Sequence, residues 1–314
     1  MAQDTAVSAR DIWIRLLLYP AHTLPTAAAP VLGGVGLGLR DGVFSALPVV
    51  VAFFGSWLIH VGGVLADNYA LLRRHADVPE HPELLQAVDT GVLQLGTLRW
   101  ITIGCFLLGA APAPYLVAIG GPLVLVIGAV GIMASLGYAA GGMRYVRLGL
   151  ADPLFFAMFG VVAVVGTYYI QAGPAAGGVW DRFAVTEALP LSAFVVGLPI
   201  GALVTNVMVI DDIRDRDWDA DKGWRTTAVR FGLAGSRVEY TALTLLAYAA
   251  PFALWWWLPA SAWVLLPLAT LPLALLVLRA VLTRDTTAEL FVMSPRASML
   301  SLAYAALLCV GLAA

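Results

Sequence analysis

The chain has 314 residues, of which 61% are apolar and only 12% are charged, and its mean hydropathy is +0.86. The charged share is about half that of a typical globular protein, which excludes a soluble fold and a disordered chain. A net charge of −2 gives no basis for binding nucleic acid. The two cysteines, Cys105 and Cys309, lie in apolar stretches and form neither a disulfide framework nor a zinc-ligand spacing. The composition therefore predicts an all-α, polytopic membrane protein.

Nine stretches are long and apolar enough to cross a membrane as helices. They cover residues 22–39, 43–65, 98–115, 117–139, 153–172, 186–210, 237–257, 259–281 and 294–313. Residues 1–9 contain Asp4 and no basic residue, so we expect the first stretch to stay in the membrane rather than to be cleaved as a signal. The whole chain, residues 1–314, is expected to form one membrane-embedded domain.

The basic residues predict the orientation of these helices. With the N-terminus in the cytoplasm, every one of the 18 Lys and Arg residues except Arg40 and Arg182 falls in a cytoplasmic loop. Cytoplasmic loops of membrane proteins carry such an excess of Lys and Arg. The pattern favours nine helices with the C-terminus outside.

Two polar segments, residues 66–89 and 210–232, follow the second and the sixth predicted helix on the same side of the membrane. If the sixth helix continues past Ile210, then Asp211, Asp215 and Asp219 recur at i, i+4 and i+8 and share one face. Like charges on one face repel each other unless a cation neutralises them, and Mg²⁺ commonly bridges carboxylates to substrate phosphates. Asp217 would point elsewhere. The segment thus predicts a Mg²⁺ and phosphate site, with a solvated mixed-charge loop as the alternative.

Basic residues beside these carboxylates are candidates for contacting phosphate oxygens. In the later segment they are Arg214, Lys222 and Arg225. Arg binds phosphate by paired hydrogen bonds, and Lys binds it as a point charge. The earlier segment offers the polar residues Asp67, Asn68 and Asp77 and the basic residues Arg73 and Arg74. These five residues could equally be ordinary helix-end residues and membrane-side anchors.

Taken together, these segments resemble the UbiA superfamily of intramembrane prenyltransferases. That family has nine membrane helices and two Asp-rich motifs, which follow helices two and six. Its second motif resembles D-D-I-R-D-R-D-W-D-A-D-K-G-W-R-T-T-A-V-R-F-G at 211–232. T-L-P-T-A-A-A-P-V-L-G-G at 23–34 and F-G-V-V-A-V-V-G-T-Y-Y-I-Q at 159–171 are similar to the menaquinone-pathway branch, the 1,4-dihydroxy-2-naphthoate polyprenyltransferases. The resemblance spans essentially the whole chain.

The first motif departs from the family pattern, Asn-Asp-x-x-Asp with a distal Asp. Here it reads D-N-Y-A-L-L-R-R-H-A-D at 67–77, so Asp67 and Asn68 stand in swapped order. The middle Asp is replaced by Leu71, or by Leu72 if Asn68 is the motif's Asn. Asp77 matches the distal Asp.

The resemblance implies Mg²⁺-dependent transfer of an isoprenoid chain from a prenyl diphosphate to an aromatic, quinone-type acceptor, with release of diphosphate. It implies a multi-pass protein of a cell membrane, such as a bacterial inner membrane, with its active site facing the cytoplasm. The implied catalytic residues are Asp67, Asn68, Asp211 and Asp215. The implied metal ligands are Asp67, Asn68, Asp77, Asp211, Asp215 and Asp219, and the implied diphosphate contacts are Arg73, Arg74, Arg214, Lys222 and Arg225.

Two other functions stay open. Some members of the superfamily are membrane terpene cyclases, and the altered first motif favours keeping that reaction as an alternative. A transporter would place isolated charges near the middle of the membrane, whereas the charges here cluster at helix ends on one side. Tyr69, Tyr138, Tyr168 and Tyr169 are candidates to stabilise an allylic cation through their aromatic faces.

Overall fold

The structure is a computed structural model that describes residues 8–18, 23–75, 83–138, 145–175, 189–258 and 261–314. Every regular element in these residues is helical, which confirms the predicted all-α class. The first half contains α1 (Ala9–Leu18), α2 (Thr23–Arg40), α3 (Ala46–Leu72), α4 (Glu83–Asp89), α5 (Leu95–Ala110), α6 (Ala113–Gly120), α7 (Pro122–Gly137), the 3₁₀ turn η2 (Tyr145–Leu148) and α8 (Ala151–Phe155). The second half contains the π-helical segment η3 (Phe156–Val162), α9 (Ala163–Ala175), α11 (Leu191–Arg214), α12 (Arg216–Asp221), α13 (Thr227–Trp257), the 3₁₀ helix η4 (Ala262–Thr270), α14 (Leu271–Thr283), α15 (Thr287–Phe291) and α16 (Met293–Ala313).

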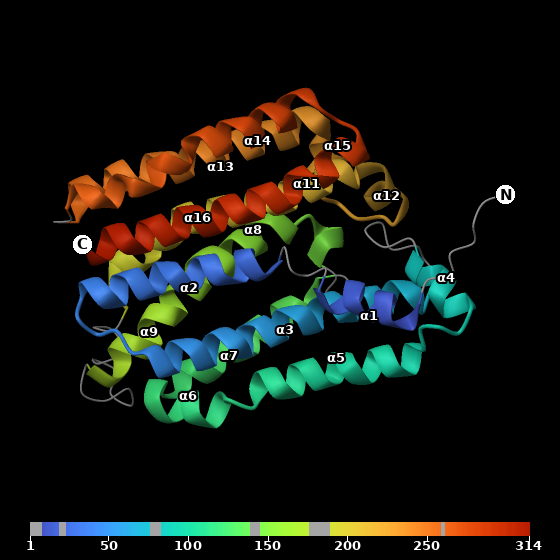
Figure 1. Ribbon diagram of the computed structural model, residues 1–314, viewed down its shortest axis with the longest axis horizontal. Helices are drawn as coiled ribbons and strands as arrows, with labels where there is room; N and C mark the ends of the chain where they lie inside the picture. Colours follow the sequence, from blue (N-terminus) through green and yellow to red (C-terminus); the bar gives the residue numbers. More distant parts are fainter. Residues whose placement is uncertain (1–7, 19–22, 76–82, 139–144, 176–188, 259–260) are drawn as a thin grey trace.

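The long helices lie side by side along the longest dimension of the molecule (Figure 1). Helix α16 packs against α2, α11 packs against α13, and α3 packs against α5. The short helices α4, α12 and α15 all lie at one end of this bundle, which we call the polar end. Helices α3 and α11 both finish there, so the two polar segments seen in the sequence are brought to the same end.

Six helical stretches are long and apolar enough to cross a membrane, namely Ala46–Leu72, Leu95–Gly120, Ala151–Gly173, Leu191–Arg214, Ala262–Thr283 and Glu289–Ala313. Helix α7 is apolar but shorter. Each of the nine stretches expected from the sequence overlaps a helix of the structure. The six stretches support a multi-pass membrane protein, whereas nine crossings and a cytoplasmic N-terminus stay predictions.

The boundary between the third and fourth predicted helices is displaced. The sequence placed it near residue 116, but helix α6 continues to Gly120 and the chain turns at Gly121. Gly121 has a φ of 68°, which favours glycine, and Pro122 then begins α7. A Gly-Pro pair therefore sets this boundary, rather than the local drop in hydropathy.

Helix α11 and the segment η3 touch backbone to backbone. A Cβ atom at Gly160 would lie 2.5 Å from the Gly201 Cα atom and 2.8 Å from the Gly197 carbonyl oxygen. Small residues allow membrane helices to approach this closely. The contact fixes η3 against the helix that carries the later Asp-rich segment.

Replacing Gly160 with Ala is expected to lower the melting temperature of the purified protein in detergent. The added methyl group must displace backbone atoms, and overpacking of this kind costs about 1–3 kcal/mol. Gly104→Ala is the matched control, because a Cβ atom at Gly104 meets no other atom within 4 Å. Equal melting temperatures for the two variants would contradict the tight contact.

Candidate active site

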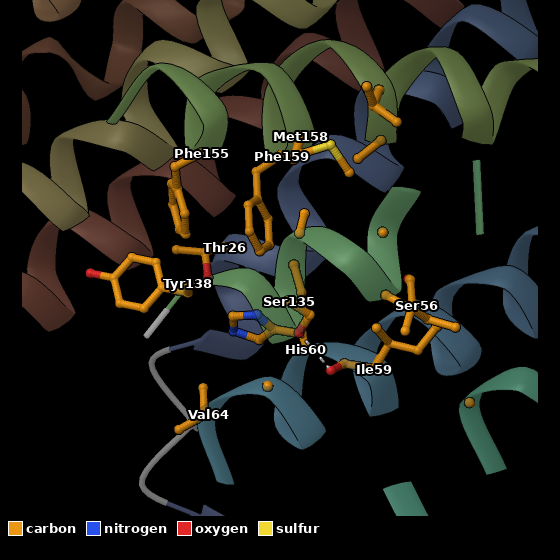
Figure 2. A pocket seen from close by; sticks show the side chains of 18 of the residues that line it. Thr26, Ser56, Ile59, His60, Val64, Ser135, Tyr138, Phe155, Met158 and Phe159 are labelled. Atoms are coloured by element: carbon orange, nitrogen blue, oxygen red, sulfur yellow. Dashed lines mark hydrogen bonds between the residues drawn. The ribbon is translucent and has the colours of Figure 1, made fainter. Parts of the chain in front are cut away.

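A cavity of about 750 Å³ opens inside the bundle, walled mainly by α2, α3, α7, η3 and α9. Figure 2 shows a part of its wall, with Phe155, Met158 and Phe159 on one side and Ile59 and His60 on the other. The His60 and Phe159 rings meet edge to face, 5.2 Å apart. Most of the lining is apolar, so this part of the cavity suits an apolar ligand.

The polar end of the cavity is lined by acidic side chains from both Asp-rich segments. Helix α3 contributes Asp67 and Asn68, and the chain from α11 into α12 contributes Asp211, Asp212, Asp215 and Asp219. The structure therefore brings together five of the six metal ligands that the resemblance implied. The sixth, Asp77, lies outside the described residues.

The later segment is not one continuous helix, although α11 does continue past Ile210. Helix α11 ends at Arg214, Asp215 leaves the helical conformation with φ −102° and ψ 8°, and α12 begins at Arg216. Backbone hydrogen bonds from Asp215 N to Asp211 O (2.9 Å) and from Asp219 N to Asp215 O (2.8 Å) cross the break. The four-residue spacing thus survives, and all three carboxylates line the cavity.

Arg214, an implied diphosphate contact, is not part of the cavity lining in this structure. Its guanidinium donates to the Asp211 carboxylate (Nη1 to Oδ1, 2.7 Å) and to both oxygens of the Asp215 carboxylate (2.8 and 2.5 Å). Its side chain is only 4% exposed. A buried, bidentate pair of this kind fixes geometry. We therefore assign Arg214 to positioning Asp211 and Asp215.

Asp219 is buried, unlike the other two aspartates of α12. It is 3% exposed, and burial, followed by the nearby Asp215 carboxylate, raises the pKa of Asp219 to about 8. Its carboxylate accepts a hydrogen bond from Thr226 Oγ1 (3.3 Å). Asp217 and Asp221 are exposed and do not line the cavity, and for Asp217 this agrees with the expectation that it points elsewhere.

The acidic end of the cavity fits Mg²⁺ shared with a phosphate ligand. Among the residues that the structure describes, no three His, Cys, Asp or Glu side chains converge into a complete metal cage. Mg²⁺ does not need one, since it usually takes one or two carboxylates together with phosphate oxygens and water. The lining carboxylates are hard oxygen donors, and Arg214 is the basic residue between Asp211 and Asp215.

A smaller pocket of about 220 Å³ lies beside the acidic end, and we call it the basic pocket. It is lined by Asp67, Ala70, Leu71, Arg74, Arg147, Lys222 and Trp224. Arg74 and Lys222, two of the implied diphosphate contacts, therefore line it. Arg73 and Arg225 are exposed and line neither pocket.

The two leucines of the altered first motif have different surroundings. Leu71 lines both the cavity and the basic pocket, whereas Leu72 is 1% exposed and packs in an apolar cluster with Leu16 and Leu65. Of the two alternatives that the motif leaves open, Leu71 is the one whose side chain lines the cavity.

Replacing Leu71 with Asp is expected to lower the Mg²⁺ concentration needed for half-maximal activity, by about tenfold, because ligand charge tunes cation affinity. The control, Leu72→Asp, would bury an unpaired charge and is expected to lower the protein level instead. An unchanged Mg²⁺ requirement for Leu71→Asp would place residue 71 outside the metal site.

Several residues at the acidic end were not expected from the sequence. Trp218 and Trp224 line the cavity with their rings edge to face at 5.2 Å, and Trp224 meets Tyr138 at 5.7 Å. Asp212 is 5% exposed and lines the cavity. Its position directly after Asp211 was the available signal, but the expected helical face excluded it.

The four candidate tyrosines differ in whether they line the cavity. Tyr138 lines the cavity, whereas Tyr69, Tyr168 and Tyr169 are not part of its lining. The Tyr168 hydroxyl donates to Asp41 Oδ2 (2.7 Å), and the Tyr169 hydroxyl donates to the Gly120 carbonyl oxygen (2.6 Å). These two hydroxyls therefore serve packing between helices.

The sequence profile of the UbiA prenyltransferase family matches residues 27–312, nearly the whole chain. The chain belongs to the UbiA prenyltransferase family. It is thus a member of a family of prenyltransferase enzymes, as the motifs predicted.

Three relatives named 1,4-dihydroxy-2-naphthoate octaprenyltransferase match over most of the chain. The Escherichia coli protein is 26% identical over 248 residues, which cover 77% of this chain and 75% of the relative. The Haemophilus influenzae protein is 28% identical, and the match covers 74% of this chain and 76% of that relative. The Mycobacterium tuberculosis protein is 29% identical, and the match covers 81% of each chain.

Solved UbiA structures have the same fold. The apo structure of a UbiA homolog from Aeropyrum pernix K1 superposes with a TM-score of 0.66 at 18% identity, over 88% of this chain and 94% of that one. At this identity the likeness shows the fold alone.

Proposed function

We propose that the protein transfers an isoprenoid chain from a prenyl diphosphate to an aromatic, quinone-type acceptor such as 1,4-dihydroxy-2-naphthoate, and releases diphosphate. The observation that carries this proposal is one cavity with two chemically different ends. Acidic side chains suited to a cation line one end, and an apolar lining suited to a prenyl chain forms the rest. The relatives' names supply the acceptor and the class of donor.

The acidic end is the proposed diphosphate site. Asp67 and Asn68 on α3 and Asp211, Asp215 and Asp219, which line the same cavity, would supply the metal ligands, with Asp77 as a further proposed ligand. Bound Mg²⁺ would neutralise the diphosphate and make it a better leaving group. Arg214 holds Asp211 and Asp215 in place, while Arg74 and Lys222 approach the diphosphate from the basic pocket.

The apolar part of the cavity protects the reacting carbon. When the bond between the first carbon of the chain and the diphosphate oxygen breaks, its electron pair stays on the oxygen and an allylic cation forms. A dry site keeps water from attacking that cation. The faces of Tyr138 and Trp224 can stabilise it. The aromatic ring then bonds to the chain, and the attacked ring carbon loses a proton, or carbon dioxide where it carries a carboxylate.

The proposed reaction also fixes an orientation. Diphosphate and Mg²⁺ are water-soluble, so the polar end should face an aqueous compartment. The distribution of Lys and Arg in the sequence favours the cytoplasm, with residues 1–314 acting as one domain in a cell membrane.

One observation supports a second candidate reaction. Leu71 replaces a carboxylate at the edge of the acidic end, which changes the charge around the leaving group. The second candidate is a terpene cyclase, in which the same allylic cation is captured by a double bond of its own chain.

Product analysis separates the two reactions. Membranes containing the protein are incubated with Mg²⁺ and prenyl diphosphates of several lengths, with and without 1,4-dihydroxy-2-naphthoate, and products are identified by mass spectrometry. Membranes with the Asp215→Asn variant control for other enzymes. A prenylated acceptor supports the proposed function, whereas a cyclic hydrocarbon formed without acceptor overturns it in favour of the cyclase.

A further inference from the structure

The basic pocket gathers cationic side chains from three separate parts of the chain. Arg74 follows α3, Arg147 lies in η2, and Lys222 follows α12. The Arg147 guanidinium donates to the Lys222 carbonyl oxygen (Nη2 to O, 3.1 Å), which ties η2 to the turn after α12. The Lys222 ammonium lies 5.5 Å from the centre of the Trp218 ring. This arrangement concentrates three positive charges around a small pocket.

The basic pocket and the acidic end of the cavity have a common wall. Asp67, Leu71 and Trp224 line both. Among the described residues that line the basic pocket, three are basic and one, Asp67, is acidic. The lining therefore changes from mainly acidic at the acidic end of the cavity to mainly basic in the basic pocket.

The chemistry of the basic pocket suits an oxyanion. Guanidinium groups bind phosphate or carboxylate oxygens by paired, charge-assisted hydrogen bonds, and an ammonium group adds a point charge. Arg74 and Arg147 are exposed, so the pocket lies at the protein surface rather than in the apolar cavity.

We propose that the basic pocket is a second oxyanion site, which receives inorganic diphosphate after transfer. This inference rests on the proposed function. When the bond from carbon to oxygen breaks, the diphosphate keeps the electron pair and gains a negative charge, so its attraction to Arg74, Arg147 and Lys222 increases. Arg74 and Lys222 then contact the diphosphate both before and after transfer, whereas Arg147 acts on the released group.

Binding of inorganic diphosphate in excess chelator tests the proposal. Without divalent cations, the carboxylates of the acidic end repel diphosphate, so the remaining binding reports on the basic pocket. Calorimetry on the purified full chain is expected to show binding that Arg147→Gln weakens about tenfold, as loss of a charge-assisted hydrogen bond predicts. Arg147→Lys keeps the charge and is expected to retain most of the affinity.

Arg99→Gln is the matched control, because Arg99 is exposed, lies near the start of α5 and lines neither pocket. It removes the same charge and should leave diphosphate binding unchanged. Equal losses for Arg147→Gln and Arg99→Gln, or no diphosphate binding to the wild type in chelator, would overturn the proposal. Melting temperatures show that each variant is folded, and if Arg147→Gln fails to fold, Lys222→Gln against Arg99→Gln decides by the same comparison.

An aromatic carboxylate is the other possible source of an oxyanion, so 1,4-dihydroxy-2-naphthoate is titrated in the same way. If Arg147→Gln weakens naphthoate binding and leaves diphosphate binding intact, the pocket serves the acceptor and the proposal fails. Neither titration needs turnover. The product assay can therefore fail while Arg147-dependent diphosphate binding persists, which would remove the proposed function and leave the oxyanion site.

Discussion

Replacing Asp215 with Asn is expected to lower the rate of prenyl transfer by about 10²–10³-fold, the usual loss when one charge-stabilising contact is removed. Asp215 lines the acidic end of the cavity and receives two hydrogen bonds from the buried Arg214 guanidinium. The amide has nearly the same shape as the carboxylate but carries no charge. The substitution therefore removes a proposed cation ligand and half of the pairing of Arg214.

Asp217→Asn is the matched comparison, because it makes the same chemical change two residues away. The Asp217 side chain is 90% exposed and pairs with Arg216 (3.1 Å), so its loss should change the rate by less than about twofold. Protein level and melting temperature are measured for both variants, since a buried Arg214 with a weakened partner can also reduce stability. Equal rate losses in two equally folded variants would mean that this segment acts as a diffuse acidic loop.

Removing divalent cations is expected to abolish turnover. Five carboxylates line the acidic end of the cavity, and without a cation they repel both each other and a diphosphate. A bound metal typically contributes several kcal/mol to such a reaction, equivalent to about 10²–10³-fold or more in rate. The measurement is product formation in excess chelator, followed by titration with Mg²⁺.

The chelation experiment needs two controls. Activity must return when Mg²⁺ is restored, which excludes irreversible unfolding, and the melting temperature in chelator must show that the fold persists. Full turnover in excess chelator would contradict the metal site.

Much of the site could be predicted from the sequence. Hydropathy places α3 and α11 in a membrane bundle, and the polar segments at their ends follow on the same side. The four-residue spacing of Asp211, Asp215 and Asp219 identified three lining carboxylates, because backbone hydrogen bonds preserve that spacing across the break at Asp215. Spacing is a local property, so it is accessible without knowledge of the fold.

The remaining features depend on contacts that spacing does not specify. Arg214 pairs with its own neighbours because the helix ends there and turns the guanidinium back onto Asp211 and Asp215. Arg147 reaches the basic pocket through its bond to the turn after α12, 75 residues away along the chain. The Arg147 contact leaves no sequence pattern, whereas Arg214 and Asp211 stand at the i, i+3 spacing of a helical ion pair.

The most direct test is a structure of the protein with Mn²⁺ in place of Mg²⁺ and an unreactive prenyl thiodiphosphate. Anomalous scattering would locate the cation independently of the protein coordinates. We expect the metal signal between Asp67 and Asn68 on α3 and the carboxylates of Asp211, Asp215 and Asp219, with the prenyl chain along the apolar cavity past Phe159. Density for the ligand with the metal elsewhere, or with the chain outside the cavity, would contradict the proposed site.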